Sequence, residues 1–290
     1  MPSYLVTGGN GQLAKCFKEV RGEFSNHRFF FENKDTVDIT NPETLKKSFD
    51  SRPFDGIINC AGYTQVDFAE EEYEKAKKIN VEGLRNISVF AEEKELCIVN
   101  FSSDYIFDGT SSSPYKENDK PNPINKYGYS KYKGELLLEK TSCQHTTFRI
   151  SWLFSPFEEN FVKTILKLSK VKEIIQVVND QHGRPTYGID LARTVLSNIS
   201  KPDFFDFNSY NYAMQGTTTW FDFASKILAI KKSTCQIKSC STAEYPTLAK
   251  RPKHSVLDTK RIENHLSLNI ASWENSLKRC LKRIDNNEKI

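Results

Sequence analysis

Three residues whose types and spacing suit proton transfer stand near the middle of the chain. Tyr127 and Lys131 are four residues apart, so on a helix they share one face. A phenol beside an ammonium group can become acidic enough to exchange a proton near neutral pH. Ser103, just past the apolar segment 96–101, could hold a substrate oxygen beside that phenol. Tyrosine and lysine are common and usually mark a solvated helix face, so the pattern needs a second signal.

A glycine-rich turn at the start of the chain supplies that second signal. After a short apolar strand at residues 4–6, Gly8, Gly11 and Ala14 follow as G-x-x-G-x-x-A and open a helix. Glycines let the backbone approach a pyrophosphate, and the new helix offers unpaired N–H groups and the positive end of its dipole. An ordinary strand-to-helix turn is the alternative, and the position directly after the first strand favours dinucleotide binding.

Alternating strands and helices must position these residues. The pattern predicts strands at 4–6, 27–31, 54–60, 96–101 and 146–151, with helices that start at Asn41, span 69–95 and contain Tyr127. Such alternation predicts an α/β fold, a Rossmann-like doubly wound parallel sheet with right-handed crossovers. Ligands of these sheets bind beyond the carboxyl ends of the strands, where the glycine turn, residues 60–62 and Ser103 all fall.

The pattern becomes less regular after residue 151. We expect a helix at 161–168, a strand at 173–178, a helix at 190–199, a loop-rich aromatic stretch at 203–245 and a solvated basic helix face at 278–283. These elements suggest a smaller, interleaved α+β substrate domain. Residues 1–154 plus about 185–212 would form an NAD(P)-binding Rossmann domain, and about 155–184 plus 213–290 the substrate domain.

Composition excludes several classes of protein. The 290 residues carry a net charge of +4 with scattered cations, which does not suggest a nucleic-acid partner. No apolar run approaches the ~20 residues that span a bilayer, and no signal peptide precedes the first strand, so neither membrane association nor export is expected. Seven dispersed cysteines without a C-x-x-C motif suggest reduced thiols in the cytoplasm and no zinc site.

The chain resembles the extended short-chain dehydrogenases/reductases, and among them the dTDP-4-dehydrorhamnose reductase family. The stretches that carry the resemblance run from residue 7 to residue 258: TGGNGQLA, VDITNPE, INCAGYTQVDFAE, INVEG, FSSDYIFDG, PYKENDKPNPINKYGYSKYKGE, NFVKTIL, VVNDQHGRPTYGIDLA and RPKHSVLD. The resemblance implies an oxidoreductase that uses NADPH to reduce the 4-keto group of a nucleotide-linked 6-deoxyhexose, as in dTDP-L-rhamnose and polysaccharide biosynthesis.

The resemblance also implies roles for individual residues. Tyr127 would protonate the alkoxide forming at sugar C4, Lys131 would bind the nicotinamide ribose and lower the pKa of Tyr127, and Ser103 would bind the keto oxygen. The residues expected to bind the cofactor are Gly8, Asn10, Gly11, Gln12, Leu13, Asn33, Lys34, Asp38, Ile39, Ala61, Gly62, Tyr63, Tyr127 and Lys131. Those expected to bind the substrate are Ser103, Asp104, Tyr105, Trp152, Asn160 and Arg184. Core packing for Trp152, and surface roles for Asn160 and Arg184, are alternatives of similar weight.

Two departures from related sequences bear on the reaction. The acid that binds the ribose 2′-hydroxyl in NAD-preferring relatives is replaced by Asn33, followed by Lys34, which favours NADPH over NADH. Glu32 could restore the acid if the strand ended one residue earlier. The Asp-Glu pair of 4,6-dehydratases is here Asp104-Tyr105, so the carboxylate needed for water elimination is absent and reduction fits better.

Several alternatives stay open at this stage. The chain could be a nucleotide-sugar epimerase of the same superfamily, or a non-catalytic NADP-binding regulatory subunit, although the intact Ser103, Tyr127 and Lys131 disfavour the latter. The nucleotide and the keto sugar are not determined. The resemblance allows a monomer or a homodimer with magnesium at its interface, but no metal ligands can be assigned.

Overall fold

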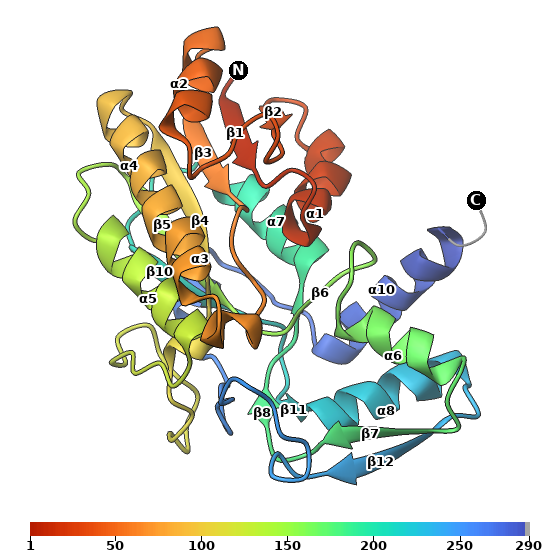
Figure 1. The fold of residues 1–290 in the computed structure, drawn as a ribbon. Helices are drawn as coiled ribbons and strands as arrows, with labels where there is room; N and C mark the ends of the chain where they lie inside the picture. The colour runs from red at the N-terminus through yellow and green to blue at the C-terminus, as the bar shows by residue number, and fades with distance from the viewer. Residues whose placement is uncertain (288–290) are drawn as a thin grey trace.

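A parallel sheet forms the larger part of the molecule (Figure 1). The computed structural model describes residues 1–287, so the end of the predicted substrate domain, 288–290, lies outside the described residues. Within them the main sheet has six parallel strands in the order β10-β5-β4-β3-β1-β2. Their bounds are β1 Ser3–Thr7, β2 Arg28–Phe31, β3 Gly56–Asn59, β4 Cys97–Ser103, β5 His145–Ile150 and β10 Ser209–Tyr212. The predicted Rossmann-like sheet is confirmed.

The order of the strands locates the ligand crevice. β1 is paired with β2 on one side and with β3 on the other, so the chain winds in opposite directions from β1. In doubly wound sheets this reversal opens a crevice at the carboxyl ends of the central strands. Every residue of β3 is buried, as expected for a strand covered on both faces.

Helices cover both faces of this sheet (Figure 1). On one face α1 (Gln12–Val20) packs against α7 (Gly188–Asn198). On the other lie α2 (Pro42–Ser51), α4 (Leu84–Glu93) and α5 (Lys126–Leu138). The predicted cap of α2 is confirmed, because the Asn41 side chain accepts a hydrogen bond of 3.1 Å from the Glu43 amide.

The predicted helix at 69–95 starts later than expected, at Tyr73, and contains a π-helical turn, which corrects the expectation from periodicity. A 3₁₀ turn (Phe68–Glu70) and α3 (Tyr73–Lys77) precede a π-helical turn at Lys78–Gly83, and α4 follows. The π turn directs the Asn80 side chain toward residue 63, where its Oδ1 accepts from the Tyr63 amide at 2.9 Å. Such bulges recur at functional sites, and a helical repeat of apolar residues does not reveal them.

A second, smaller sheet lies apart from the first. In it β7 (Ile174–Val178) pairs with β12 (Gln236–Cys240) in parallel, beside α6 (Phe161–Ser169) and α8 (Trp220–Lys231) (Figure 1). The remaining elements are β6 Leu153–Phe154, β8 His182–Gly183, β9 Thr186–Tyr187, β11 Thr218–Thr219, α9 Lys260–His265, α10 Trp273–Asn287, and 3₁₀ turns at Arg21–Glu23 and Asp104–Ile106. Helix α8 was not predicted, although Thr219 caps it by accepting from the Asp222 amide at 3.0 Å.

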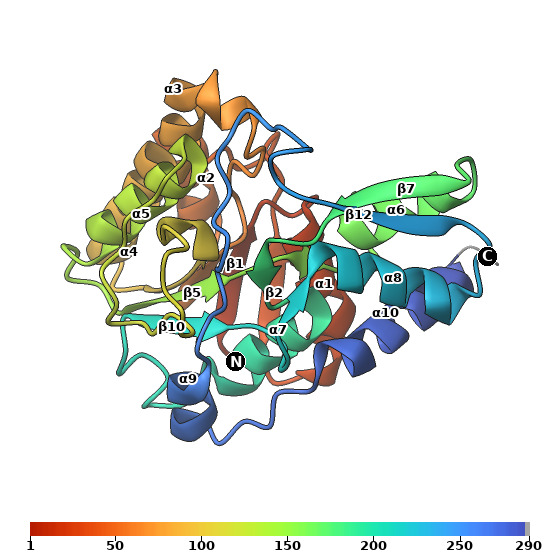
Figure 2. The ribbon, with the colours of Figure 1, turned by 90° about the horizontal axis from the view of Figure 1, so that it is seen from below.

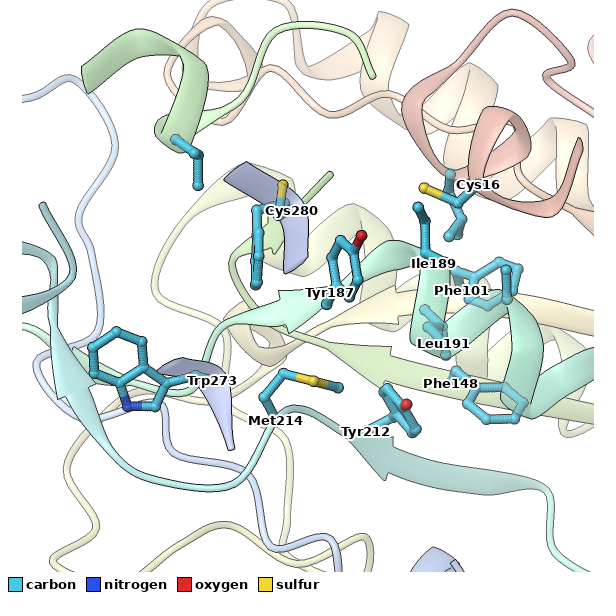
Figure 3. Packing of buried hydrophobic residues seen from close by; sticks show 14 of the residues in the cluster. Cys16, Phe101, Phe148, Tyr187, Ile189, Leu191, Tyr212, Met214, Trp273 and Cys280 are labelled. Carbon is cyan, nitrogen blue, oxygen red and sulfur yellow. The ribbon is translucent and has the colours of Figure 1, made fainter. Parts of the chain in front are cut away.

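The hydrophobic core is continuous between the two regions. One cluster of buried side chains extends from Phe101 and Phe148 of the main sheet through Tyr187 and Met214 to Trp273 of α10 (Figure 3). The basic run 278–283 follows on α10, where Cys280 and Leu281 are buried and Lys278 and Lys282 face solvent. Among the helices of residues 1–287, none is both long and apolar enough to cross a membrane.

Candidate active site

The end of β4 and the first turns of α5 bring the predicted catalytic residues together. Helix α5 is capped by Asn125, whose Oδ1 accepts from the Gly128 amide at 2.7 Å. A Cβ atom on Gly128 would lie 2.0 Å from the Tyr105 carbonyl oxygen, so glycine lets α5 pack directly on the chain that follows β4. The Tyr127 hydroxyl thereby contacts Ser103.

Lys131 lies between β4 and the loop that follows β3. Its Nζ donates a hydrogen bond of 2.7 Å to the Phe101 carbonyl. A Cβ atom on Gly62 would lie 3.5 Å from the same Nζ, so the ammonium group is next to the loop predicted to hold the middle of the cofactor. One helix face therefore connects Ser103 with the glycine-rich loops, as the i, i+4 spacing predicted.

Burial determines the protonation of these groups. It raises the pKa of Tyr127 to about 12, against a smaller lowering by Ser103, and the charge of Asp104 raises this pKa further. Burial likewise lowers the pKa of Lys131 to about 8, opposed by Glu135. Ser103 is the neighbour that lowers the pKa of the phenol here, and an acidifying role for Lys131 stays a prediction.

The first loop has the geometry of a phosphate cradle. Gly8 has a φ of +64°, and a Cβ atom there would lie 2.8 Å from the backbone of Ala61. The Gly11 amide donates to the Gly8 carbonyl at 2.8 Å and closes the turn. Helix α1 starts immediately afterwards, and its N-cap, Gly11, has no side chain that could satisfy the first N–H groups. These N–H groups can therefore donate hydrogen bonds to a pyrophosphate.

A cavity of about 490 Å³ continues from this cradle. The predicted cofactor residues that line it are Gly8, Asn10, Gly11, Lys34, Asp38, Ile39, Ala61 and Gly62. Lys75, Lys78 and Ile79 also line the cavity and were not predicted, because the expected long helix did not indicate which of its faces would turn to the site. The glycine turn, the loop after β3 and three lysines thus line one cavity.

Six predicted cofactor residues do not line this cavity: Tyr127 and Lys131, described above, and Gln12, Leu13, Asn33 and Tyr63. Leu13 is buried in the core. Gln12 donates to the Ser155 hydroxyl at 3.1 Å, Asn33 accepts from the Asp35 amide at 2.8 Å, and the Tyr63 hydroxyl donates to Glu72 at 3.1 Å. Of these side chains, only that of Asn33 closes its own turn, whereas those of Gln12 and Tyr63 contact other segments of the chain.

Buried polar side chains fix the strand ends beneath the site. Thr7 donates to Asn59 at 2.7 Å, and Asn59 donates to Asn100 at 3.0 Å, which links the three central strands. Asn80 performs a similar task beside α5, because its Nδ2 donates to the Ser130 hydroxyl at 2.9 Å. Sequence reasoning missed both sets, since isolated asparagines give no pattern until the fold places them together.

A second cavity, of about 430 Å³, opens on the other side of Tyr105. Its walls come from both regions of the fold: Asp67, Tyr105, Phe161, Thr164, Ile165, Leu168, Ile175, Gln176, Val177, Val178, Gln181, Trp220, Tyr245, Thr247 and Arg251. Tyr105 is the predicted substrate residue among them. The ring of Tyr105 also meets that of Tyr127 edge-on, with centroids 6.0 Å apart, so this cavity lies next to the predicted catalytic residues.

Three other predicted substrate residues have structural contacts. Trp152 has a φ of +48°, and its ring stacks on that of Trp220 with centroids 3.7 Å apart. Because Trp220 lines the second cavity, Trp152 supports this part of the cavity wall. Asn160 caps α6 and donates to the Ser155 carbonyl at 2.9 Å, while Arg184 donates to the Leu257 carbonyl at 3.1 Å. Neither Asn160 nor Arg184 lines the two cavities, and a substrate contact for each stays a prediction.

Asp104 is a buried carboxyl group directly beside the catalytic hydroxyls. It accepts from the Ser103 hydroxyl at 3.1 Å, and burial raises its pKa to about 7. Above this pKa its negative charge raises the pKa of Tyr127 and makes the phenol a weaker acid, whereas protonation removes that effect.

We therefore expect kcat/KM for reduction to rise as pH falls through about 7, and Asp104→Asn to remove this inflection. The check is a pH–rate profile from pH 5.5 to 9 at saturating NADPH. Asp50→Asn, on the exposed surface of α2, should keep the wild-type profile. Identical profiles for wild type and Asp104→Asn would contradict the assignment.

The fold and the site define a class of protein. A doubly wound sheet, a glycine-rich phosphate turn, and a serine, tyrosine and lysine at the sheet's edge are the arrangement of the extended short-chain dehydrogenases/reductases. Residues 3–286 match the family model described as RmlD substrate binding domain. The dTDP-4-dehydrorhamnose reductase of Aggregatibacter actinomycetemcomitans is 34% identical over 287 residues, which cover 96% of this chain and 98% of that protein. The chain belongs to the dTDP-4-dehydrorhamnose reductase family.

Solved structures agree with this membership. The dTDP-4-dehydrorhamnose reductase ortholog of Clostridium acetobutylicum superposes with a TM-score of 0.92 at 34% identity, covering 98% of this chain and 99% of that one. The reductase of Bacillus anthracis, solved in complex with NADP, superposes with a TM-score of 0.91 at 34% identity over the same shares. Within residues 1–287 here, no group of three or more His, Cys, Asp or Glu side chains is placed to hold a metal ion.

Proposed function

We propose that this chain reduces the 4-keto group of a nucleotide-linked 6-deoxyhexose with NADPH, as in dTDP-L-rhamnose biosynthesis. Family membership supports the substrate class. The observation that carries the chemistry is the contact between Ser103 and Tyr127, with Lys131 of the same helix lying next to Gly62 at the cofactor cavity. A hydrogen-bond donor, an acid and a cation thus lie between Gly62 of the first cavity and Tyr105 of the second.

The residues around the first cavity fit a nicotinamide dinucleotide. The N–H groups at the start of α1 would bind the pyrophosphate, and Gly8 leaves room that a side chain would fill. Lys131 would hold the nicotinamide ribose. The bound cofactor supplies the hydride, and the protein supplies position and charge.

Proton transfer is the task of the protein's own side chains. Ser103 donates a hydrogen bond to the keto oxygen and keeps it near Tyr127. Tyr127 gives its proton to the oxygen as negative charge develops there. The pKa of about 12 keeps the phenol protonated at neutral pH, as a proton donor requires.

The second cavity is our candidate for the nucleotide end of the substrate. Its apolar wall, from Ile165 to Ile175 and Val177, suits a planar base, while Gln176 and Gln181 offer hydrogen bonds. This placement also gives the smaller region, about 155–184 plus 213–290, the role of a substrate domain, with residues 1–154 plus about 185–212 binding the cofactor.

A panel of 4-keto nucleotide sugars tests the proposal. With NADPH present, we expect the nicotinamide absorbance to fall in a 1:1 ratio with the 6-deoxyhexose formed. An epimerase would convert sugar without net NADPH oxidation. A regulatory subunit would bind NADPH and turn over no sugar in the panel, and either result would overturn the proposal.

The preference for NADPH should depend on Lys34. This residue lines the first cavity beside Asp35, whereas the Asn33 side chain is turned into its own loop. We expect Lys34→Ala to lower kcat/KM for NADPH by about 5- to 10-fold, because one charged contact with a phosphate contributes roughly 1 kcal/mol. The kcat/KM for NADH should change by less than about twofold. Lys47→Ala, on the exposed side of α2, is the matched control. A wild-type enzyme that prefers NADH would contradict the interpretation.

A further inference from the structure

A long segment crosses the molecule beside the second cavity. The chain leaves β12 at residue 240, runs to the α3 end of the cofactor-binding region, and returns toward α9 (Figure 2). We call residues 245–253 of this segment the strap. Tyr245, Thr247 and Arg251 of the strap line the second cavity, while Tyr245 and Leu248 are more than half exposed. The strap thus forms one rim of the cavity.

An ion pair fastens the strap to the loop that follows β3. Arg251 donates to both carboxylate oxygens of Asp67, at 2.9 and 2.7 Å, across 184 positions of sequence. The Ala249 amide donates to the same carboxylate at 3.0 Å, and Arg251 donates back to the Ala249 carbonyl at 2.9 Å. Two-pronged contacts of this kind fix orientation as well as distance. The hydrogen bonds from Arg251 lower the pKa of Asp67, which keeps the pair ionised at neutral pH.

The strap is also joined to the catalytic helix. Asn125, the cap of α5, donates through Nδ2 to the Lys250 carbonyl at 2.9 Å. The backbone amide of Lys126 donates to Glu70 at 2.8 Å, which lies in the same turn as Asp67. The strap, the 67–70 turn and the start of α5 therefore meet at one point, one residue before Tyr127.

Tyr105 connects this junction with the reacting groups. Its hydroxyl interacts with Arg251, and its ring stands at 78° to that of Tyr127. Asp67, Tyr105 and Arg251 all face the second cavity. A shift of Arg251 would therefore move Tyr105, and with it the surface against which the sugar lies.

We propose that Arg251 is a positioning residue for the reduction, which acts by latching the strap to Asp67 and holding Tyr105 against Tyr127. This inference rests on the proposed function. It assigns the salt bridge a kinetic role that a merely structural contact would not have. Misplacement of a reacting group by about 1 Å can cost on the order of 100-fold in rate.

A double-mutant cycle tests the latch. We expect Arg251→Gln and Asp67→Asn each to lower kcat/KM for the keto sugar by about 10- to 100-fold, with the Kd of NADPH changed by less than about twofold. The double variant should be no worse than the more impaired single variant, because both break the same contact. Arg251→Lys should recover only part of the loss, since an ammonium cannot make both hydrogen bonds. Losses that multiply in the double variant, or kcat/KM unchanged in the singles, would overturn the proposal.

A matched pair elsewhere in the chain controls for stability. Arg193 of α7 binds Glu23 with two contacts of 2.7 and 2.8 Å, across 170 positions and away from both cavities. Glu23→Gln should change Tm about as much as Asp67→Asn while leaving kcat/KM within about twofold of wild type. A kinetic loss of the same size in Glu23→Gln would show a general effect of stability and would contradict the latch.

Limited proteolysis gives a readout that does not depend on turnover. Trypsin should cleave after Lys250 or Lys253 at least several times faster in Asp67→Asn than in wild type or in Glu23→Gln. This result would support the latch even if none of the sugars in the panel were reduced, so failure of the proposed function and failure of the latch are distinguishable. Equal cleavage rates in all three proteins would overturn it.

Discussion

Tyr127→Phe should lower kcat/KM for reduction of the 4-keto sugar by about 10²- to 10⁴-fold, the usual contribution of a positioned general acid. The change removes one oxygen atom and leaves the ring, which packs edge-on against Tyr105, in place. Burial already keeps the hydroxyl protonated, so the variant loses the proton and no other function. The measurement is steady-state kinetics with NADPH at saturating concentration, combined with the Kd of NADPH.

Tyr129→Phe is the matched control for this variant. Tyr129 lies two residues later on α5, and 41% of its surface is exposed, so the same chemical change there should leave kcat/KM within about twofold. The Kd of NADPH should be unchanged in both variants, since the cofactor cradle is untouched. Turnover of Tyr127→Phe at the wild-type rate would rule out its role as the acid.

The second large effect concerns stability. We expect Glu135→Ala to lower the free energy of unfolding by about 3–5 kcal/mol, because it leaves the Arg149 guanidinium buried and unpaired. Arg149 donates to Glu135 at 2.7 Å, and the side chains are only 5% and 4% exposed. The guanidinium also donates to the Glu117 carbonyl at 2.9 Å, which holds it in its buried position when its partner is lost. Urea denaturation followed by circular dichroism measures the change.

An exposed pair provides the comparison. Lys167 binds Glu159 at 2.6 Å, but both side chains are about two-thirds exposed. Glu159→Ala should therefore cost less than about 1 kcal/mol. A loss below 1 kcal/mol for Glu135→Ala would show that Arg149 finds another partner. The position of Glu135, one turn after Lys131, means that the loss should also loosen the catalytic helix.

The pattern of apolar and turn residues was sufficient to predict the strands of the main sheet and the turns next to them. All five strands expected in the first half of the chain are present, because strands of a buried parallel sheet read as short apolar runs between turn residues. The glycine turn and the Tyr127–Lys131 pair could be predicted from local spacing, since each depends on residues within one turn of a helix or loop. Helix α8 was missed in an aromatic stretch, although Thr219 and Asp222 carried its capping signal.

The functional assignments divide in the same way. Residues whose task is set by backbone conformation, such as Gly8 beside Ala61, are recognisable from their type and place after a strand. Residues whose side chains can bind either a ligand or a nearby turn are not recognisable in this way. Asn33 and Asn160 were expected at ligands, which stays a prediction; in the structure both bond their own loops, because short amide side chains readily bond nearby backbone groups.

Local sequence was enough to predict the glycine turn, the strand–helix alternation and the Tyr127–Lys131 pair on α5, because the interactions that define them span only a few residues. Only the tertiary structure shows that Asp67 lies next to Arg251, and Thr7 next to Asn59, which in turn contacts Asn100. These contacts join segments from 41 to 184 positions apart. Long-range polar contacts depend on how the whole chain packs, and no short pattern of residues carries that information.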